Sequence, residues 1–223
     1  MKVAFIIGAS RGIGLEFVRQ YRADGWRVLA SARSAEGIAR LKGLGAEPIE
    51  VDVTDATQID KLKSTLAHIA LDVAIINAGV LTAPGNAFTP SQEDFDVAMH
   101  TNVLAAMRLV PVLEVGLKEA KGVLVMMSSR MGSIESMSSP SELLYRVSKA
   151  ALNAVMKGAA LRLGPENVRV LALHPGWVRT DMGGPAASLD VGESVHGLRG
   201  VIQKATVAQN GLLFDYQGSP IPF

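Results

Sequence analysis

The chain has 223 residues, of which 48% are hydrophobic and 19% charged, and this apolar fraction excludes an intrinsically disordered protein. Its 22 Lys and Arg side chains against 21 Asp and Glu argue against a nucleic-acid-binding protein, which needs a strong basic excess. The sequence contains no cysteine, which excludes disulfides, thiolate catalysis and cysteine-ligated zinc.

Short apolar runs recur along the chain, and each has the length of a β-strand. Because the apolar residues run on rather than alternate with polar ones, the strands are expected to be parallel and buried on both faces. The predicted strands are residues 3–7, 27–31, 48–51, 73–76, 123–127, 168–173 and 212–215.

Helix-length segments separate these strands. The predicted helices are residues 12–24, 54–69 with its N-cap at Thr54 or Asp55, 91–115 with a bend near Pro111, and 141–163. This alternation predicts the α/β class: a doubly wound, Rossmann-like parallel sheet in three αβα layers, as a single domain over residues 1–223. The least regular stretch, residues 182–192, is predicted to be a loop that covers the substrate.

The first predicted strand runs into a glycine-rich turn at the start of a helix. Gly8, Gly12 and Gly14 allow the backbone to approach a pyrophosphate, and the helix N-terminus favours the negative charge. The other candidate cofactor contacts in this turn are Ser10, Arg11 and Ile13.

The end of the second predicted strand indicates which dinucleotide binds. An acidic residue there would bind the ribose 2′-hydroxyl of NAD, but the sequence has Arg33. Arg33 and Arg11 could hold a 2′-phosphate, which favours NADP(H) over NAD(H), although both could also be solvated surface arginines. Asp52 could accept from the adenine amino group or cap the next helix, and Val53 beside it is a further candidate contact.

A tyrosine and a lysine lie one helical turn apart in the last predicted helix. Tyr145 and Lys149 are four residues apart and share one helix face. A nearby ammonium, helped by the charge of a bound nicotinium, favours a phenolate, so we expect Lys149 and the cofactor to lower the pKa of Tyr145 from about 10. Tyr145 could then give a proton to a carbonyl oxygen or take one from an alcohol.

Five motifs, in order along nearly the whole chain, resemble those of the short-chain dehydrogenase/reductase family. The residues that carry the resemblance are Gly8 to Gly14, Asn77-Ala78-Gly79, Asn102, the Ser129, Tyr145 and Lys149 set, and Pro175, Gly176, Val178 and Thr180. The sequence is most similar to the small carbonyl-reductase-like branch, which includes the sniffer and C-factor proteins.

The resemblance implies a role for each matched residue. It implies that Tyr145 is the general acid/base, that Ser129 hydrogen-bonds the reacting oxygen, and that Lys149 also holds the nicotinamide ribose. It implies that Asn102 holds a water and that Thr180 contacts the nicotinamide carboxamide. Because the gap between serine and tyrosine is longer than in many members, Ser128 or Ser133 could replace Ser129.

These observations predict an NADP(H)-dependent oxidoreductase that interconverts a ketone or aldehyde and its alcohol. No histidine pair has metal-ligand spacing, so no metal site is expected. The alternative is a dinucleotide-binding signalling or interaction protein of the same fold with little or no turnover.

The remaining expectations concern location and assembly. The chain shows no targeting segment, and its longest uncharged stretch, residues 73–92, contains Pro84 and Pro90, so we expect a cytoplasmic protein with no membrane partner. Small residues on the two long predicted helices permit close packing on the sheet or on a partner, and a homodimer or homotetramer is expected. They are Ala105, Ala106, Ala150, Ala151, Ala154, Ala159 and Ala160.

Overall fold

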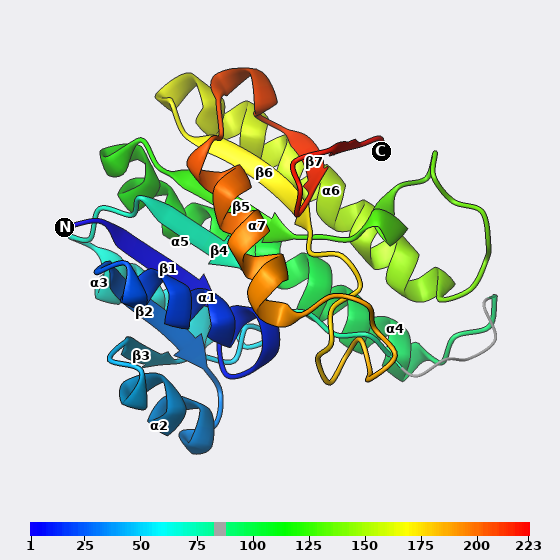
Figure 1. The fold of residues 1–223 in the computed structure, drawn as a ribbon, viewed down its shortest axis with the longest axis horizontal. Coiled ribbons are helices and arrows are strands. Elements are labelled where there is room, and N and C mark those ends of the chain that lie inside the picture. Colours follow the sequence, from blue (N-terminus) through cyan, green and yellow to red (C-terminus); the bar gives the residue numbers. More distant parts are fainter. Residues whose placement is uncertain (83–87) are drawn as a thin grey trace.

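A single twisted sheet forms the centre of the molecule (Figure 1). The computed structural model describes residues 1–82 and 88–223. The sheet has the order β3-β2-β1-β4-β5-β6-β7-β8, and its first seven strands in this order are parallel. They are β1 (Val3–Ile7), β2 (Arg27–Ala32), β3 (Glu47–Glu50), β4 (Val73–Ile76), β5 (Val123–Met127), β6 (Arg169–His174) and β7 (Leu212–Asp215); β8 (Pro220–Ile221) is antiparallel to β7. The predicted doubly wound parallel sheet is therefore confirmed.

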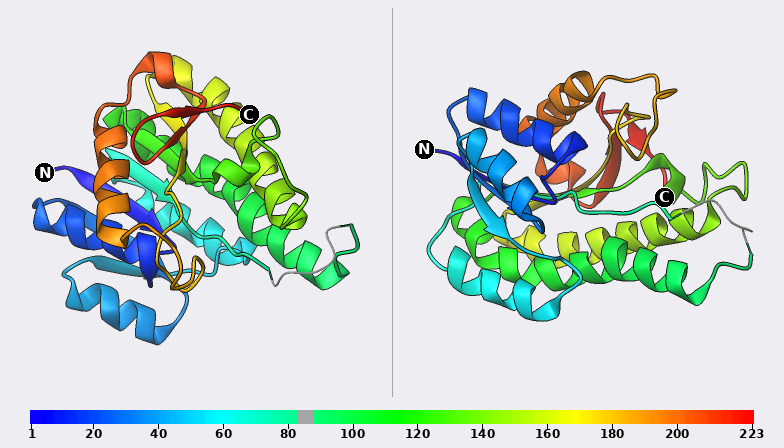
Figure 2. Two further views of the ribbon diagram at one scale, coloured as in Figure 1. Left: turned by 45° about the vertical axis from the view of Figure 1, so that its right-hand side comes forward. Right: turned by 90° about the horizontal axis from the view of Figure 1, so that it is seen from below.

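Helices cover both faces of this sheet. One apolar layer packs α1 (Gly12–Ala23), α2 (Ala35–Gly43) and α7 (Val191–Gln203) against one face. The other layer packs α3 (Ala56–Leu66), α5 (Ala105–Ala120) and α6 (Leu143–Leu163) against the opposite face. The edge-on view in Figure 2 shows α1 and α7 on one side of the sheet and α5 and α6 on the other. Central strands are buried on both faces, which explains their unbroken apolar runs.

The strand order reverses between β1 and β4. The connection after β1 crosses one face of the sheet and the connection after β4 crosses the other. In open α/β sheets this reversal leaves a crevice beyond the carboxyl ends of the strands, where ligands bind. The glycine turn after β1 and the residues that follow β4, β5 and β6 all lie along this edge.

The segment predicted as one helix over residues 91–115 contains a wider turn. It begins as α4 (Gln92–Met99), passes through a π-helical turn at His100–Leu104 and continues as α5 to Ala120. Pro111 lies inside α5, so the irregularity falls seven residues or more before the proline that was expected to cause it. The π turn contains Asn102, and such turns are frequent at functional sites.

Two helices were missing from the sequence-based prediction. These are α2 and α7, both rich in glycine or charged residues. Of the two predicted caps for α3, the structure uses Asp55, whose carboxylate accepts from the amides of Thr57 and Gln58. In the part of the chain that the structure describes, no helix combines the length and the hydropathy needed to cross a membrane.

Candidate active site

The glycine turn after β1 packs directly on the residues that follow β4. Gly8 has φ +84°, and a Cβ there would lie 2.7 Å from the backbone of Ala78. Asn77 donates from Nδ2 to the Gly8 carbonyl at 2.7 Å. The Asn77-Ala78-Gly79 motif therefore holds the turn in place, and the first amides of α1 face the crevice with no side-chain cap at Arg11. Uncapped helix amides and a close backbone are suited to bind a phosphate.

Three arginines surround this turn. Arg33 is exposed just beyond β2 and forms no ion pair among the described residues. Arg11 is paired with Asp181 at 3.0 Å. Arg40 of α2, which the sequence analysis did not single out, donates to the Ser10 carbonyl at 2.8 Å. Arg40 lies on α2, a helix that the sequence analysis did not predict, so only the assignment of that helix could have indicated its position.

Asp52 lies beside Arg33 but does not cap α3. Its carboxylate accepts from the amide of Thr54 at 2.9 Å and from the Thr54 hydroxyl at 2.7 Å. These two hydrogen bonds, and the positive charge of Arg33, lower the pKa of Asp52. Asp52 is therefore not the N-cap of α3, because Asp55 occupies that position. Val53, next to Asp52, is buried.

Tyr145, Ser129 and Lys149 meet where β5 ends beside the first turns of α6. The Ser129 hydroxyl lies near enough to the Tyr145 phenol to lower its pKa. The ammonium of Lys149 lies 5.6 Å from the centroid of the Tyr145 ring and donates to the Met127 carbonyl at 2.8 Å. The structure thus brings Ser129, from the end of β5, to the pair that sequence spacing had already placed on one helix face.

The pKa values of this pair differ from the expected pattern. Burial raises the pKa of Tyr145 to about 12, against a smaller lowering from the Ser129 hydroxyl. Burial lowers the pKa of Lys149 to about 8. Desolvation dominates the pKa of the phenol, and Lys149 is not among the causes of its shift. Tyr145 therefore holds its proton at neutral pH, as a proton donor must.

Only one of the three candidate serines faces the phenol. Ser128 donates to Asn153 Oδ1 at 2.6 Å, and Ser133 accepts the amide of Ser136 at 3.1 Å. Ser129 is the one that contacts Tyr145. Sequence spacing favoured Ser129 but left the other two open.

Asn153 is a residue that the sequence analysis missed. Its Nδ2 donates to the Gly132 carbonyl at 3.1 Å, while its Oδ1 accepts from Ser128. Gly132 in turn lies against α6, since a Cβ there would be 2.8 Å from the backbone of Lys149. The buried Asn153 amide therefore ties both sides of Ser129 to the helix that carries Tyr145 and Lys149.

Asn102 is buried in the π turn, and both hydrogens of its side-chain amide are donated to other groups. Its Oδ1 accepts from the Val80 amide at 2.8 Å, and its Nδ2 donates to the Val80 carbonyl and to Ser148 Oγ, each at 2.9 Å. The Ser148 hydroxyl in turn donates to the Tyr145 carbonyl at 2.8 Å. An amide nitrogen has two hydrogens, so a water at Asn102 would have to bind one of its oxygens. A Cβ on Gly79 would lie 3.2 Å from Asn102 Oδ1 and 3.4 Å from Lys149 Nζ, so these residues converge.

The segment after β6 returns over the glycine turn. Pro175 accepts from Ser194 Oγ at 2.6 Å, and Val178 bridges to Leu189, which closes residues 180–188 into a loop. Gly176 has φ +85°, and a Cβ there would meet Leu189 at 2.7 Å. The methyl of Thr180 would lie 3.3 Å from a Cβ on Gly12. The loop predicted at 182–192 is thus positioned beside the glycine turn, and α7 takes over from Val191.

His174 is the titratable group at the end of β6. Burial and the charge of Arg130 lower its pKa to about 4, although Asp215 opposes the shift. His174 is therefore neutral at pH 7 and unsuited to give a proton there. Within the two described ranges, no three His, Asp or Glu side chains are placed to hold a metal ion.

Comparison with known proteins agrees with this geometry. The family model for short chain dehydrogenase matches residues 2–189. C-signal of Myxococcus xanthus is 36% identical over 154 residues, which cover 69% of this chain and 93% of C-signal. Carbonyl reductase Sniffer of D. melanogaster superposes with a TM-score of 0.91 at 29% identity, covering 100% of this chain and 99% of Sniffer. A short-chain dehydrogenase/reductase of Burkholderia multivorans with bound NADP has a TM-score of 0.87 at 33% identity, covering 100% and 99% of the two chains. The chain therefore belongs to the short-chain dehydrogenase/reductase family.

Proposed function

We propose that the protein is an NADP(H)-dependent oxidoreductase that reduces a ketone or aldehyde to its alcohol, or runs the reverse reaction. The observation that carries this proposal is the close approach of Ser129 to a protonated Tyr145, with Lys149 beside them, at the carboxyl edge of the sheet. A proton donor, a second hydroxyl and a cation at this edge are what carbonyl reduction requires.

Cofactor binding is assigned to the glycine turn and its neighbours. The Gly8 turn has no room for a side chain against Ala78, which leaves its backbone open to a pyrophosphate. Arg33, with no ion pair among the described residues, is free to pair with a 2′-phosphate, and Arg40 lies on the same side of the turn. The relative from Burkholderia multivorans was solved with bound NADP, which supports the same choice here. The remaining contacts proposed are Ser10, Arg11, Gly12, Ile13, Gly14, Asp52, Val53, Asn77, Ala78, Gly79, Pro175, Gly176, Val178 and Thr180.

The chain's own groups handle the proton. NADPH, when bound, supplies the hydride to the carbonyl carbon. Tyr145 donates its phenolic proton to the carbonyl oxygen, and Ser129 donates a hydrogen bond that stabilises the negative charge developing there. Lys149 then faces a phenolate, which its ammonium stabilises until solvent returns the proton. Asn102 fixes the π turn behind Lys149.

The substrate is proposed to lie under the loop of residues 182–192. Trp177, which precedes this loop, and Met182, at its start, are 56% and 48% exposed. Met137, beyond Ser129 in the chain, is 38% exposed. Met126 and Met127, by contrast, are core residues of β5 and do not line a pocket. Exposed apolar side chains near the crevice favour an apolar carbonyl compound.

NADPH consumption with a panel of ketones and aldehydes tests the proposal. Turnover with NADPH in preference to NADH is the expected result. If the protein binds NADPH but turns over no carbonyl or alcohol, the enzyme assignment fails. The alternative, a dinucleotide-binding signalling protein, would then be favoured, in keeping with its similarity to C-signal.

A homodimer or homotetramer is proposed through the outer face of α5 and α6, the two long helices that carry the small residues. Ala105, Ala106, Ala159 and Ala160 are buried in this chain's own core, so they are not free for a partner. The outer face of α5 and α6 instead exposes Met107, Val115 and Leu161 at 55%, 63% and 71%. Native mass spectrometry of the protein and of its Val115→Glu variant tests this surface, since a charge there should shift the assembly toward monomer.

A further inference from the structure

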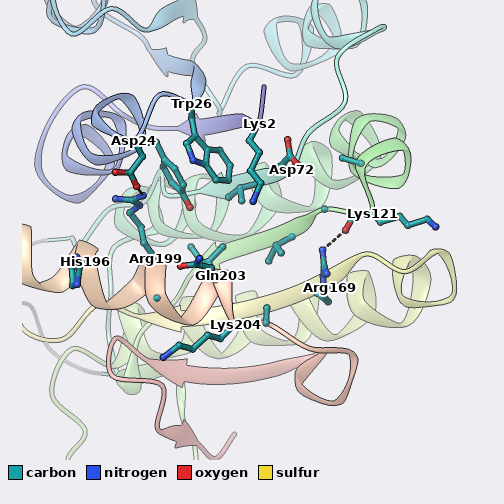
Figure 3. Close-up of a pocket in the computed structure, with 18 residues that line it drawn as sticks. Lys2, Asp24, Trp26, Asp72, Lys121, Arg169, His196, Arg199, Gln203 and Lys204 are labelled. Carbon is teal, nitrogen blue, oxygen red and sulfur yellow. Dashed lines mark hydrogen bonds and ion pairs between the residues drawn. The ribbon is translucent and has the colours of Figure 1, made fainter.

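A cavity of about 670 Å³ lies at the opposite edge of the sheet from the glycine turn (Figure 3). The starts of β1, β4, β5 and β6 and the last turns of α1 and α7 surround it. Because the strands are parallel, the length of the sheet separates this cavity from Tyr145 and the crevice. The proposed oxidoreductase reaction makes no use of it.

Cationic side chains dominate this cavity. Five Lys and Arg side chains line it against two carboxylates, in a chain whose net charge is only +1. Arg199 is neutralised by an ion pair with Asp24 and stacks on the ring of Tyr21 at 4.5 Å. The other four cations form no ion pair with any residue that the structure describes. The cavity therefore keeps an excess of positive charge.

Two of the four unpaired cations have a structural explanation. Lys121 and Lys204 are the C-caps of α5 and α7, where a cation stabilises the negative end of the helix. Figure 3 shows both side chains extending away from the cavity. Lys2 and Arg169 stand at the starts of strands β1 and β6, where no helix end accounts for their charge. Figure 3 shows them on opposite sides of the cavity.

Each arginine of the cavity has one N–H group, at Nε, that no acceptor among the described residues satisfies. Arg169 donates to the Lys121 carbonyl, while its Nε is buried with no partner among the described residues. The Nε of Arg199 is in the same condition. Buried N–H groups without a partner are rare and costly, and they commonly indicate a missing water or ligand. An oxyanion in the cavity would draw these guanidinium groups inward and supply the acceptors that the chain does not.

We propose that this cavity binds the phosphoryl group of a small organic phosphate, with Lys2 and Arg169 as its main ligands. Lys2 and Arg169 outweigh the one carboxylate left in the cavity, that of Asp72, and the guanidinium fork of Arg169 fits phosphate oxygens. Gln203, from the last turn of α7, adds an amide donor. The volume is in the range of about 300–1,000 Å³ found for small-molecule sites, so it holds more than an inorganic ion.

The two tryptophans of the chain allow the site to be tested in the intact protein. Trp26 lines the cavity, whereas Trp177 lies beside the crevice at the other edge. In a two-dimensional ¹⁵N–¹H NMR titration with pyrophosphate as the probe, we expect a saturable shift of the Trp26 indole N–H. No saturable shift at Trp26, or a shift at Trp177 alone, overturns the proposal.

Variants of the two proposed ligands, with a control variant elsewhere on the surface, then test the site. Lys2→Gln and Arg169→Gln, separately and together, should weaken pyrophosphate binding at Trp26, and the double variant should do so about tenfold or more. Lys42→Gln, which removes an exposed charge from α2, should change it less than about twofold. Equal loss in Lys42→Gln would indicate non-specific attraction to a basic protein and would overturn the site. Because Arg169 also supports Lys121, far-UV circular dichroism checks folding, and Lys2→Gln alone remains decisive if the double variant does not fold.

Discussion

Ser129 at the end of β5 lies beside the phenol of Tyr145 in the first turn of α6, although sixteen positions separate the two residues in the chain. This contact orients the phenol toward the edge of the sheet where the glycine turn lies. Among three nearby serines, Ser129 is therefore the one that we propose to act on the same substrate oxygen as Tyr145.

Replacing the phenol tests the proton donor. Tyr145→Phe should lower kcat for carbonyl reduction by about 10²–10⁴-fold, the usual contribution of a general acid, while NADPH still binds. Steady-state kinetics together with fluorescence titration of NADPH measure both effects. Tyr21→Phe, at the far edge of the sheet, serves as the matched control and should stay within about twofold of the unmodified protein. Full activity in Tyr145→Phe would refute the assigned acid.

Asn153 is predicted to position Ser129. Asn153→Leu leaves the Ser128 hydroxyl and the Gly132 carbonyl buried without partners, which should reduce the free energy of unfolding by about 1–3 kcal/mol. It should also lower kcat about tenfold or more with little change in the KM for NADPH, since the serine shifts relative to Tyr145.

A second bridging asparagine provides the control for that prediction. Asn210 accepts from the Val170 amide at 2.8 Å and donates to the Ala160 carbonyl at 3.1 Å, at the opposite end of β6. Asn210→Leu should therefore destabilise the protein to a similar extent but leave kcat unchanged. If both variants lose activity in proportion to stability, Asn153 has only a structural role.

Arg33 is predicted to set the cofactor preference. Arg33→Asp should weaken NADPH binding about tenfold or more, because it replaces a cation at the 2′-phosphate with an anion, and should leave NADH binding similar or improved. Isothermal titration with both cofactors measures the change. Arg19→Asp, an equal change of charge on the exposed side of α1, should leave the preference as it was. An unaltered ratio in Arg33→Asp would contradict the phosphate contact.

Lys149 is predicted to destabilise the fold that it serves. Its pKa falls from 10.5 to about 8 on burial, so the unfolded chain binds the proton more tightly, at a cost of about 3 kcal/mol to the folded state at pH 7. Lys149→Met removes this cost but loses the hydrogen bond to the Met127 carbonyl, worth about 1 kcal/mol. The net gain in unfolding free energy should be about 2 kcal/mol at pH 7.

The destabilisation by Lys149 depends on pH. In the unmodified protein the penalty is complete below pH 8 and disappears between about pH 8 and 10.5, so the stability gain of Lys149→Met should shrink over that interval. Urea denaturation of both proteins from pH 6 to pH 9.5 measures it. A variant that is less stable at pH 7, or a gain that grows with pH, would show that the ammonium is not desolvated as described. Whichever stability result is obtained, Lys149→Met should lose its activity.

The sequence by itself determined the parallel sheet and most of its strands. Unbroken apolar runs such as Val3–Ile7 can only be buried on both faces, and glycines between a strand and a helix allow a tight turn toward a ligand. The motif spacing also placed Tyr145 and Lys149 on one helix face, since that relationship is local to one turn.

The tertiary structure decided what depends on contacts between distant elements. It gave Ser128 and Ser133 hydrogen-bond partners other than Tyr145, brought Arg40 to the glycine turn, and showed Asn153 bridging the residues on either side of Ser129. It also showed that burial raises the pKa of Tyr145, because the number of atoms that desolvate a phenol depends on the packing around it and not on its neighbours in sequence.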